Sequence, residues 1–246
     1  MSAIRAQDSP TNLLIASLPT RDRDLVIESC EAVHLVAGVS VCDAGETIRA
    51  VYFPTDTYIS LIAPLGASES VEVGMVGSEG LFGATLTFGI KTSGVQALVQ
   101  GEGPALRMTA RRFSRVLKDS EAFKRSLNRY LYVLTMQLSQ TAACGRFHTL
   151  DARMARWLLM THDRAHKNTF ELTHQFLAYM LGVRRASVTE IAGRLQHSGL
   201  VKYTRGRLTV LDRRALEKMS CGCYAAMKAC YRKYLGGRVP KERLPG

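Results

Sequence analysis

The side chains best suited to chemistry gather between Thr173 and Gly199, in the string THQFLAYMLGVRRASVTEIAGRLQHSG. Ala178 is small enough for the close contact of two crossing helices, and Gly182 permits the left-handed backbone of a sharp turn. Val188 follows the turn at a position that would face the core between the helices. The spacing predicts two short helices joined by a tight turn, with Thr173 capping the first and Gly199 ending the second.

The segment after the second helix, LVKYTRGRLTVLD, predicts two strands joined by a basic turn at residues 204–207, a wing suited to phosphates. A winged helix-turn-helix would place the second helix in the major groove of duplex DNA, where Arg185 is our candidate for a bidentate guanine contact. A helical hairpin that packs structurally is the alternative, but it leaves the one-sided arginines and the basic hairpin unexplained. The predicted DNA-binding residues are Thr173, His174, Gln175, Arg184, Arg185, Ser187, Thr189, Glu190, Arg194, Arg205 and Arg207.

The net charge of +12 is concentrated at one end of the chain. Residues 1–143 have a net charge of −1, whereas residues 144–246 have a net charge of +13. Duplex DNA needs Lys and Arg where it docks, which fits this segregation. An anionic membrane surface would attract the same segment, so charge alone does not separate the two partners.

Short apolar runs broken by turn residues fill residues 33–108, and they predict strands of a small barrel or jelly roll with an interior able to hold a ligand. The preceding stretch from Pro19 to Glu31 predicts one helix. A long helix is predicted from Ser120 to about Cys144, ended by Gly145, and a further helix follows Thr149. Apolar positions on the long helix step by 4 and 3, as in a coiled coil, and the helix could pack on its own domain or form a dimer seam. The candidate seam residues are Leu127, Leu131, Leu134, Leu138 and Thr141.

Other classes of protein receive little support. No apolar run reaches the roughly 20 residues of a membrane helix, and the N-terminus lacks the apolar region of a secretory signal, so we expect a cytoplasmic protein without membrane contact. The nucleophile, phosphate-loop, metalloprotease and dinucleotide motifs of common enzymes are absent, so we expect no enzyme. Six scattered cysteines favour reduced thiols over a disulfide scaffold.

The whole chain resembles the Crp/Fnr family of bacterial regulators. The matching strings are VYFPTDTYISLI and VGSEGLFGA in the roll, RMARWLLMTHDR, and ELTHQFLAYMLGVRRASVTEIAGRLQHSGLVKYTRGRLTVLD at the C-terminal end. The resemblance implies a homodimer in which the roll senses a signal and the long helices carry it to two recognition helices. Two-fold symmetry would then imply a palindromic operator with half-sites about one helical turn apart.

Family members that bind cyclic nucleotide use a glutamate and an arginine in a short Gly-rich cassette of the roll. The comparable stretch here, residues 77–100, contains a glutamate but no arginine, so a phosphate would lose its bidentate partner. The effector is therefore unknown, and a packed roll with a vestigial cassette is favoured. The candidate effector-binding residues are Glu79, Gly80, Phe82, Gly83 and Lys91.

Iron–sulfur and zinc sites are not expected. Cys30 and Cys42 do not reproduce the cysteine spacing of iron–sulfur relatives. Cys221, Cys223 and Cys230 form C-x-C-x6-C, which leaves a thiol switch or metal site open, but no histidine nearby in the sequence completes a zinc site. We predict no metal and no cofactor, and buried or incidental cysteines are the commoner outcome.

The predicted fold class is α+β, with a cyclic-nucleotide-binding-like jelly roll in residues 1–118, a dimerisation helix in 119–147 and a winged helix-turn-helix in 148–246. The predicted function is sequence-specific regulation of transcription by a homodimer on double-stranded DNA, and activation would add RNA polymerase as a partner. The alternative is a nucleotide- or metabolite-binding module whose basic C-terminal region contacts an acidic partner or a membrane surface. Preference for one DNA sequence over a scrambled one separates the two.

Overall fold

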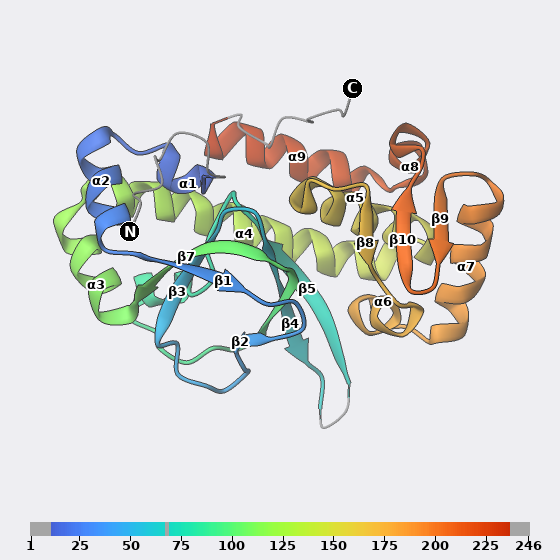
Figure 1. Cartoon of the computed structure of the whole chain (residues 1–246), viewed down its shortest axis with the longest axis horizontal. Coiled ribbons are helices and arrows are strands. Elements are labelled where there is room, and N and C mark those ends of the chain that lie inside the picture. Colours follow the sequence, from blue (N-terminus) through green and yellow to red (C-terminus); the bar gives the residue numbers. More distant parts are fainter. Residues whose placement is uncertain (1–10, 67–68, 237–246) are drawn as a thin grey trace, which may run out of the picture.

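A computed structural model describes residues 11–66 and 69–236 (Figure 1). They form a strand roll, a long helix and a C-terminal unit of helices around a small sheet, which is the predicted order and fold class. Residues 1–10 and 237–246, which the sequence analysis placed in the outer domains, lie outside the described residues.

Within the described residues, the roll consists of two antiparallel sheets. The first has the strand order β1-β7-β3, with β1 (Glu31–Leu35), β7 (Gly103–Thr109) and β3 (Ala50–Pro54). The second has the order β2-β6-β4-β5, with β2 (Ser40–Cys42), β6 (Gln96–Gly101), β4 (Tyr58–Pro64) and β5 (Ser70–Val76). Each coincides with a predicted apolar run, because side chains such as Phe53, Ile59 and Val76 alternate into one core.

Short helices close the ends of the roll: α1 (Leu13–Ala16), α2 (Thr20–Glu28), η1 (Ala84–Phe88) and α3 (Ala110–Asp119). The helix predicted from Pro19 to Glu31 ends earlier, at Glu28, because Glu31 starts β1 and pairs with Arg107. Helix α3 was not predicted, although Thr109 caps it and Phe113 is buried on its inner face. Thus α3 carries the chain from the roll to the long helix.

The long helix α4 (Glu121–Phe147) begins at Ser120, whose Oγ accepts the backbone N–H of Phe123 at 3.0 Å. The helix does not end at Gly145, where the sequence allowed an end, but continues to Phe147, the last residue of the predicted helical segment 119–147. Gly145 is exposed and nothing crowds it, so only the modest helix penalty of a glycine applies.

The C-terminal unit contains α5 (Leu150–Ala165), β8 (Thr169–Glu171), α6 (His174–Leu181), α7 (Arg185–His197), β9 (Val201–Thr204), β10 (Arg207–Val210), α8 (Arg213–Met219) and α9 (Gly222–Leu235). The strands pair in the order β8-β10-β9. Helix α9 returns to lie along α4 (Figure 1), where the rings of Tyr132 and Tyr234 meet edge to face at 4.8 Å. No helix among the described residues is both long and apolar enough to span a membrane.

A buried ion pair joins the roll to the C-terminal unit. Glu79, which follows β5, accepts hydrogen bonds from Arg164 of α5 at 2.9 Å from Nε and 2.6 Å from Nη2. The hydroxyl of Tyr231 on α9 lies 3.2 Å from Arg164 Nη2, and Gln137 of α4 donates to the same hydroxyl at 2.6 Å. One polar network therefore connects the roll, α4, α5 and α9.

A second buried contact links β5 to α5 through Glu72. Trp157 donates its indole N–H to Glu72 Oε1 at 3.0 Å, and Gln100 Nε2 lies 3.0 Å from Glu72 Oε2. Burial raises the pKa of Glu72 to about 7, and the hydrogen bonds from Ser60 and Trp157 only partly oppose this rise. The folded protein therefore holds a proton on Glu72 at pH values where the unfolded chain has released it.

The raised pKa predicts that the folded protein loses stability as pH rises, because the ionised Glu72 carboxylate is buried away from water. Because the folded pKa lies above the ordinary value of 4.5, stability falls between about pH 5 and pH 7 and stays lower above that range. Glu72→Gln stays neutral and should lose this slope, which changes the difference in unfolding free energy between pH 5 and pH 8 by about 3 kcal/mol. Urea unfolding followed by circular dichroism measures it. Glu69→Gln, at an exposed residue near the start of β5, is the control, and equal slopes in wild type and Glu72→Gln would contradict the assignment.

Candidate nucleic-acid interface

Helices α6 and α7 form the predicted helix-turn-helix. Thr173 caps α6, since its hydroxyl accepts the backbone N–H of Phe176 at 3.1 Å. Gly182 ends α6 in the left-handed conformation with φ of 63°, a backbone that a side chain would strain. The next residue, Val183, returns its N–H to the carbonyl of Ala178 at 3.0 Å. This closed turn fixes the angle at which α7 leaves α6.

The buried part of the contact between the two helices is apolar. Leu177 and Val188 are completely buried, and Ala178 is only 2% exposed at the crossing. Ile191 and Leu195 extend the same buried face along α7. The anchors predicted at positions 178, 182 and 188 are thereby confirmed, and the opposite face of α7 is left to solvent.

That solvent face carries the predicted base-reading side chains. Arg184, Arg185, Thr189 and Glu190 are exposed, whereas Ser187 is half-buried. Arg184 is the N-cap residue of α7 and Arg185 is its first helical residue. Two guanidinium groups thus stand at the end of the helix that enters the major groove in helix-turn-helix proteins.

Arg194, also a predicted contact, is already engaged within the chain. Its guanidinium lies 2.5 Å from Glu190 Oε1 and also contacts Asp151 at the start of α5. These exposed pairs are weak, but they direct the Arg194 side chain toward α5. Arg194 therefore positions α7 against its own domain in the absence of DNA.

His174 of α6 contacts both α7 and the wing. Its Nδ1 lies 3.0 Å from the hydroxyl of Thr189, and its ring meets that of Tyr203 at 4.5 Å between centroids. Burial, together with the charge of Arg185, lowers the pKa of His174. A neutral, half-buried imidazole is a positioning group here, while the neighbouring Gln175 is exposed.

The wing consists of β9, a turn and β10. Arg205 and Gly206 form the turn with φ of 49° and 78°, so the Arg205 side chain stands at its tip. A third strand, β8, was not predicted, and its Glu171 pairs with Arg207 at 3.2 Å. Arg205 is therefore better placed than Arg207 to meet a phosphate.

The candidate effector residues of the roll do not surround a common site. Glu79 is bound to Arg164, Phe82 is buried in the core, and Lys91 is exposed. A side chain at Gly80 would meet the ring of Tyr130, which fills the space next to it. The cassette is thus occupied by the protein's own side chains.

A cavity of about 420 Å³ lies instead among α1, α4, α5 and α9. Sequence reasoning missed it because its walls come from four distant segments. Its charged lining residues include Glu79, Arg125, Arg129, Asp163, Arg164 and Lys228. The cations exceed the acids, so an anionic small molecule would suit the cavity better than a cationic one.

The predicted dimer seam is partly an intramolecular contact. Leu127 is completely buried in the core of the roll, which contradicts its assignment to the seam, and Leu134 packs against the same core. Leu131, Leu138 and Thr141 are half-buried at its border. The helix packs on its own domain, as the first alternative held, and it leaves a solvent-facing strip that includes Thr135 and Ala142.

The cysteines of the C-x-C-x6-C motif separate in space. Cys221 and Cys223 lie at the start of α9 beside Cys144 and His148, whereas Cys230 lies further along α9 and outside this group. Sequence reasoning missed the group because Cys144 and His148 are more than 70 residues away in the chain.

Comparison with known proteins assigns the C-terminal unit. Residues 152–219 match the family described as the Crp-like helix-turn-helix domain, and no curated protein matches the chain. A Crp/Fnr-family regulator structure from Eubacterium rectale has a TM-score of 0.66 at 18% identity, covering 84% of this chain and 96% of its own. A CRP-family transcriptional regulator from Thermus thermophilus has a TM-score of 0.65 at 21% identity, covering 76% of this chain and 96% of its own.

A third solved structure is the c-di-GMP-responsive regulator CLP of Xanthomonas campestris, with a TM-score of 0.64 at 14% identity, covering 79% of this chain and 100% of its own. Structural likeness at these identities establishes the fold, and the family match establishes the helix-turn-helix. The chain therefore carries a Crp-like helix-turn-helix domain on the fold of the Crp/Fnr-type transcriptional regulators.

Proposed function

We propose that this protein regulates transcription by binding a specific duplex sequence through α7 and the wing. The observation that carries the proposal is the pair of exposed arginines, Arg184 and Arg185, at the start of a helix whose other face is locked to α6. A rigid helix with free cations at its leading end is suited to reading base edges. We assign the protein a binding activity and no catalytic step.

Base reading and phosphate binding fall to different residues. Arg185 has a planar guanidinium that matches the two acceptors of guanine in the major groove. Arg205 projects from the turn between β9 and β10, where a wing meets the sugar–phosphate backbone. Thr189 is exposed one turn after Arg185, although its hydroxyl is shared with His174. Arg185 would thus supply specificity and Arg205 affinity.

The charge distribution favours DNA over the alternative partner. The half of the chain that includes α7 and the wing has a net charge of +13, which suits the density of phosphates on a duplex. A binding module attracted to an acidic protein or membrane would need the charge but not the helix-turn-helix geometry. Sequence preference in DNA binding is therefore the property that distinguishes the two functions.

We further propose that two copies pair through the solvent-facing strip of α4. Thr135 and Ala142 are exposed in this strip, and Leu131 and Leu138 beside them are half-buried at the border of the roll. The four residues step by 4, 3 and 4 along α4, which is the spacing of a coiled-coil seam. Two-fold pairing would present two α7 helices to a palindrome with half-sites about one helical turn apart. The signal that controls the dimer is unidentified, and activation would require an added contact to RNA polymerase.

Selection of bound duplexes from a random pool tests the function, followed by affinity measurements at fixed salt. Arg185→Ala should lose about 1–3 kcal/mol on the selected site and relax preference at one base position. Arg205→Ala should weaken all sequences alike and reduce the salt slope by about 1. Arg111→Ala, at an exposed position on α3, is the control. A pool with no enriched sequence would reject the proposal, and a uniform loss for Arg185→Ala would reject base reading.

The dimer strip gives a separate prediction. Thr135→Glu places a carboxylate on an exposed position of α4, so two such charges would face each other across the seam. We expect the dimer dissociation constant to rise by roughly tenfold or more, measured by sedimentation. Ser114→Glu, on the exposed face of α3, adds the same charge elsewhere and should leave the dimer intact. An unchanged dimer in Thr135→Glu would show that this strip is not the interface.

A further inference from the structure

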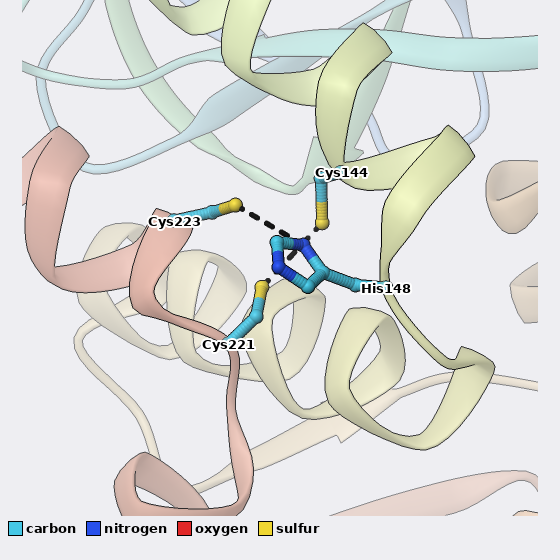
Figure 2. Close-up of side chains that lie close together, drawn as sticks. All are labelled: Cys144, His148, Cys221 and Cys223. Carbon is cyan, nitrogen blue, oxygen red and sulfur yellow. Dashed lines mark hydrogen bonds between the residues drawn. The ribbon is translucent and has the colours of Figure 1, made fainter.

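Three cysteines and a histidine converge where the long helix ends (Figure 2). Cys144 lies in the last turn of α4, and His148 is its C-cap residue. Cys221 is the N-cap residue of α9, and Cys223 is in its first turn. Figure 2 shows the four side chains pointing toward one another from these two helix ends. Their ligand atoms all lie within 4.8 Å of one another.

We propose that Cys144, His148, Cys221 and Cys223 bind one zinc ion in a tetrahedral structural site. Three thiolates and one imidazole are a ligand set of structural zinc centres. Four protein ligands leave no open position for substrate, so the site would hold the fold together and take no part in catalysis. The inference does not depend on the proposed DNA binding.

The distances between ligand atoms fit one ion at the centre. With Zn–S near 2.3 Å and Zn–N near 2.0–2.1 Å, tetrahedral geometry requires about 3.8 Å between two sulfurs and about 3.6 Å between sulfur and nitrogen. The Sγ atoms of Cys144 and Cys221 are 3.5 Å apart, and Cys223 Sγ is 3.4 Å from His148 Nδ1. An iron–sulfur cluster places several metal ions between its ligands and needs them further apart.

Burial separates this group from ordinary packed cysteines. Cys144, Cys221 and Cys223 are between 0% and 8% exposed, and they form a buried cluster of their own, against which Ala152 is the one partly buried hydrophobic residue packed among those the structure describes. Apolar packing alone does not explain why three thiols form a separate small core next to an imidazole. A metal ion gives one, because each of these groups is a zinc ligand.

A neighbouring amide is placed to support thiolate charge. Gln140, one turn before Cys144 on α4, donates from Nε2 to Cys223 Sγ at 2.9 Å. Three thiolates and Zn²⁺ carry one net negative charge, so an N–H donor at a sulfur stabilises the loaded site. Outer-shell donors of this kind orient ligands and raise metal affinity.

No metal was predicted because no histidine lies close to Cys221 and Cys223 in the sequence. The missing ligands form a separate pair, Cys144 and His148, four residues apart at the end of α4. Residues four apart on a helix lie on the same face, so the pair faces α9 once α9 has docked. In this position the ion would hold the start of α9 to the junction between α4 and α5.

Metal content of the purified full chain tests the site. We expect about one zinc per chain by mass spectrometry, and Co²⁺ substitution under reducing conditions should give thiolate-to-cobalt charge transfer and the visible bands of a tetrahedral ion. Chelation should lower the thermal unfolding midpoint, because binding energy of a structural zinc is folding energy. Loss of metal with no change in unfolding would show that the ion is adventitious.

Matched variants locate the ligands. His148→Ala removes an exposed ligand at a helix end, so the chain should still fold, and zinc affinity should fall by at least roughly a hundredfold with an altered cobalt spectrum. Cys221→Ser should abolish cobalt charge transfer from that sulfur. Cys230→Ser, outside the cluster, and His166→Ala, an exposed histidine on the left-handed C-cap of α5, are the controls.

Three further results would overturn the proposal. The first is a fully reduced chain that takes up neither zinc nor cobalt. The second is equal metal loss in Cys230→Ser and His148→Ala. The third is a Cys144–Cys221 disulfide that persists in the zinc-supplied protein, which would make the pair a redox couple instead.

Discussion

The arrangement of the molecule depends on the buried ion pair between Glu79 and Arg164. The carboxylate belongs to the roll and the guanidinium to α5, which leads directly into the helix-turn-helix domain. Breaking a buried pair by removing one partner leaves an uncompensated charge, a loss of about 3–5 kcal/mol. This pair therefore stabilises the packing of the roll against the C-terminal unit.

Other hydrogen bonds also hold the roll and the C-terminal unit together. The Glu72–Trp157 hydrogen bond holds β5 against α5, and Tyr231 brings α9 into the network of Arg164. The proposed zinc site lies at the start of α9, next to the connection between α4 and α5. Helix α4 is thus covered by the roll on one side and by α9 on another, and its remaining strip is what a second copy could contact. A ligand in the adjoining cavity would touch α4, α5 and α9 at once.

The sequence by itself determined the parts whose signals are local. The helix-turn-helix follows from Ala178, Gly182 and Val188, because a tight turn and a close helix crossing admit few residue types at those positions. The strands of the roll follow from apolar runs between turn residues, since alternate side chains must enter one core. The order of these parts also follows from the local patterns, and the resemblance to Crp/Fnr regulators added the expectation of a homodimer whose roll senses a signal.

Tertiary structure alone decided which distant side chains meet. The spacing of apolar residues by 4 and 3 on α4 fits a helix that packs against its own domain as well as one that packs against a second copy. Only the packing in the structure shows that Leu127 is buried in the roll and that Thr135 is exposed. The partner of Glu79 lies 85 residues away, and two pairs of zinc-type ligands are brought together by the return of α9. Such contacts produce no periodic pattern in the sequence. They depend on how whole helices and strands dock, and not on the residues that neighbour each side chain along the chain.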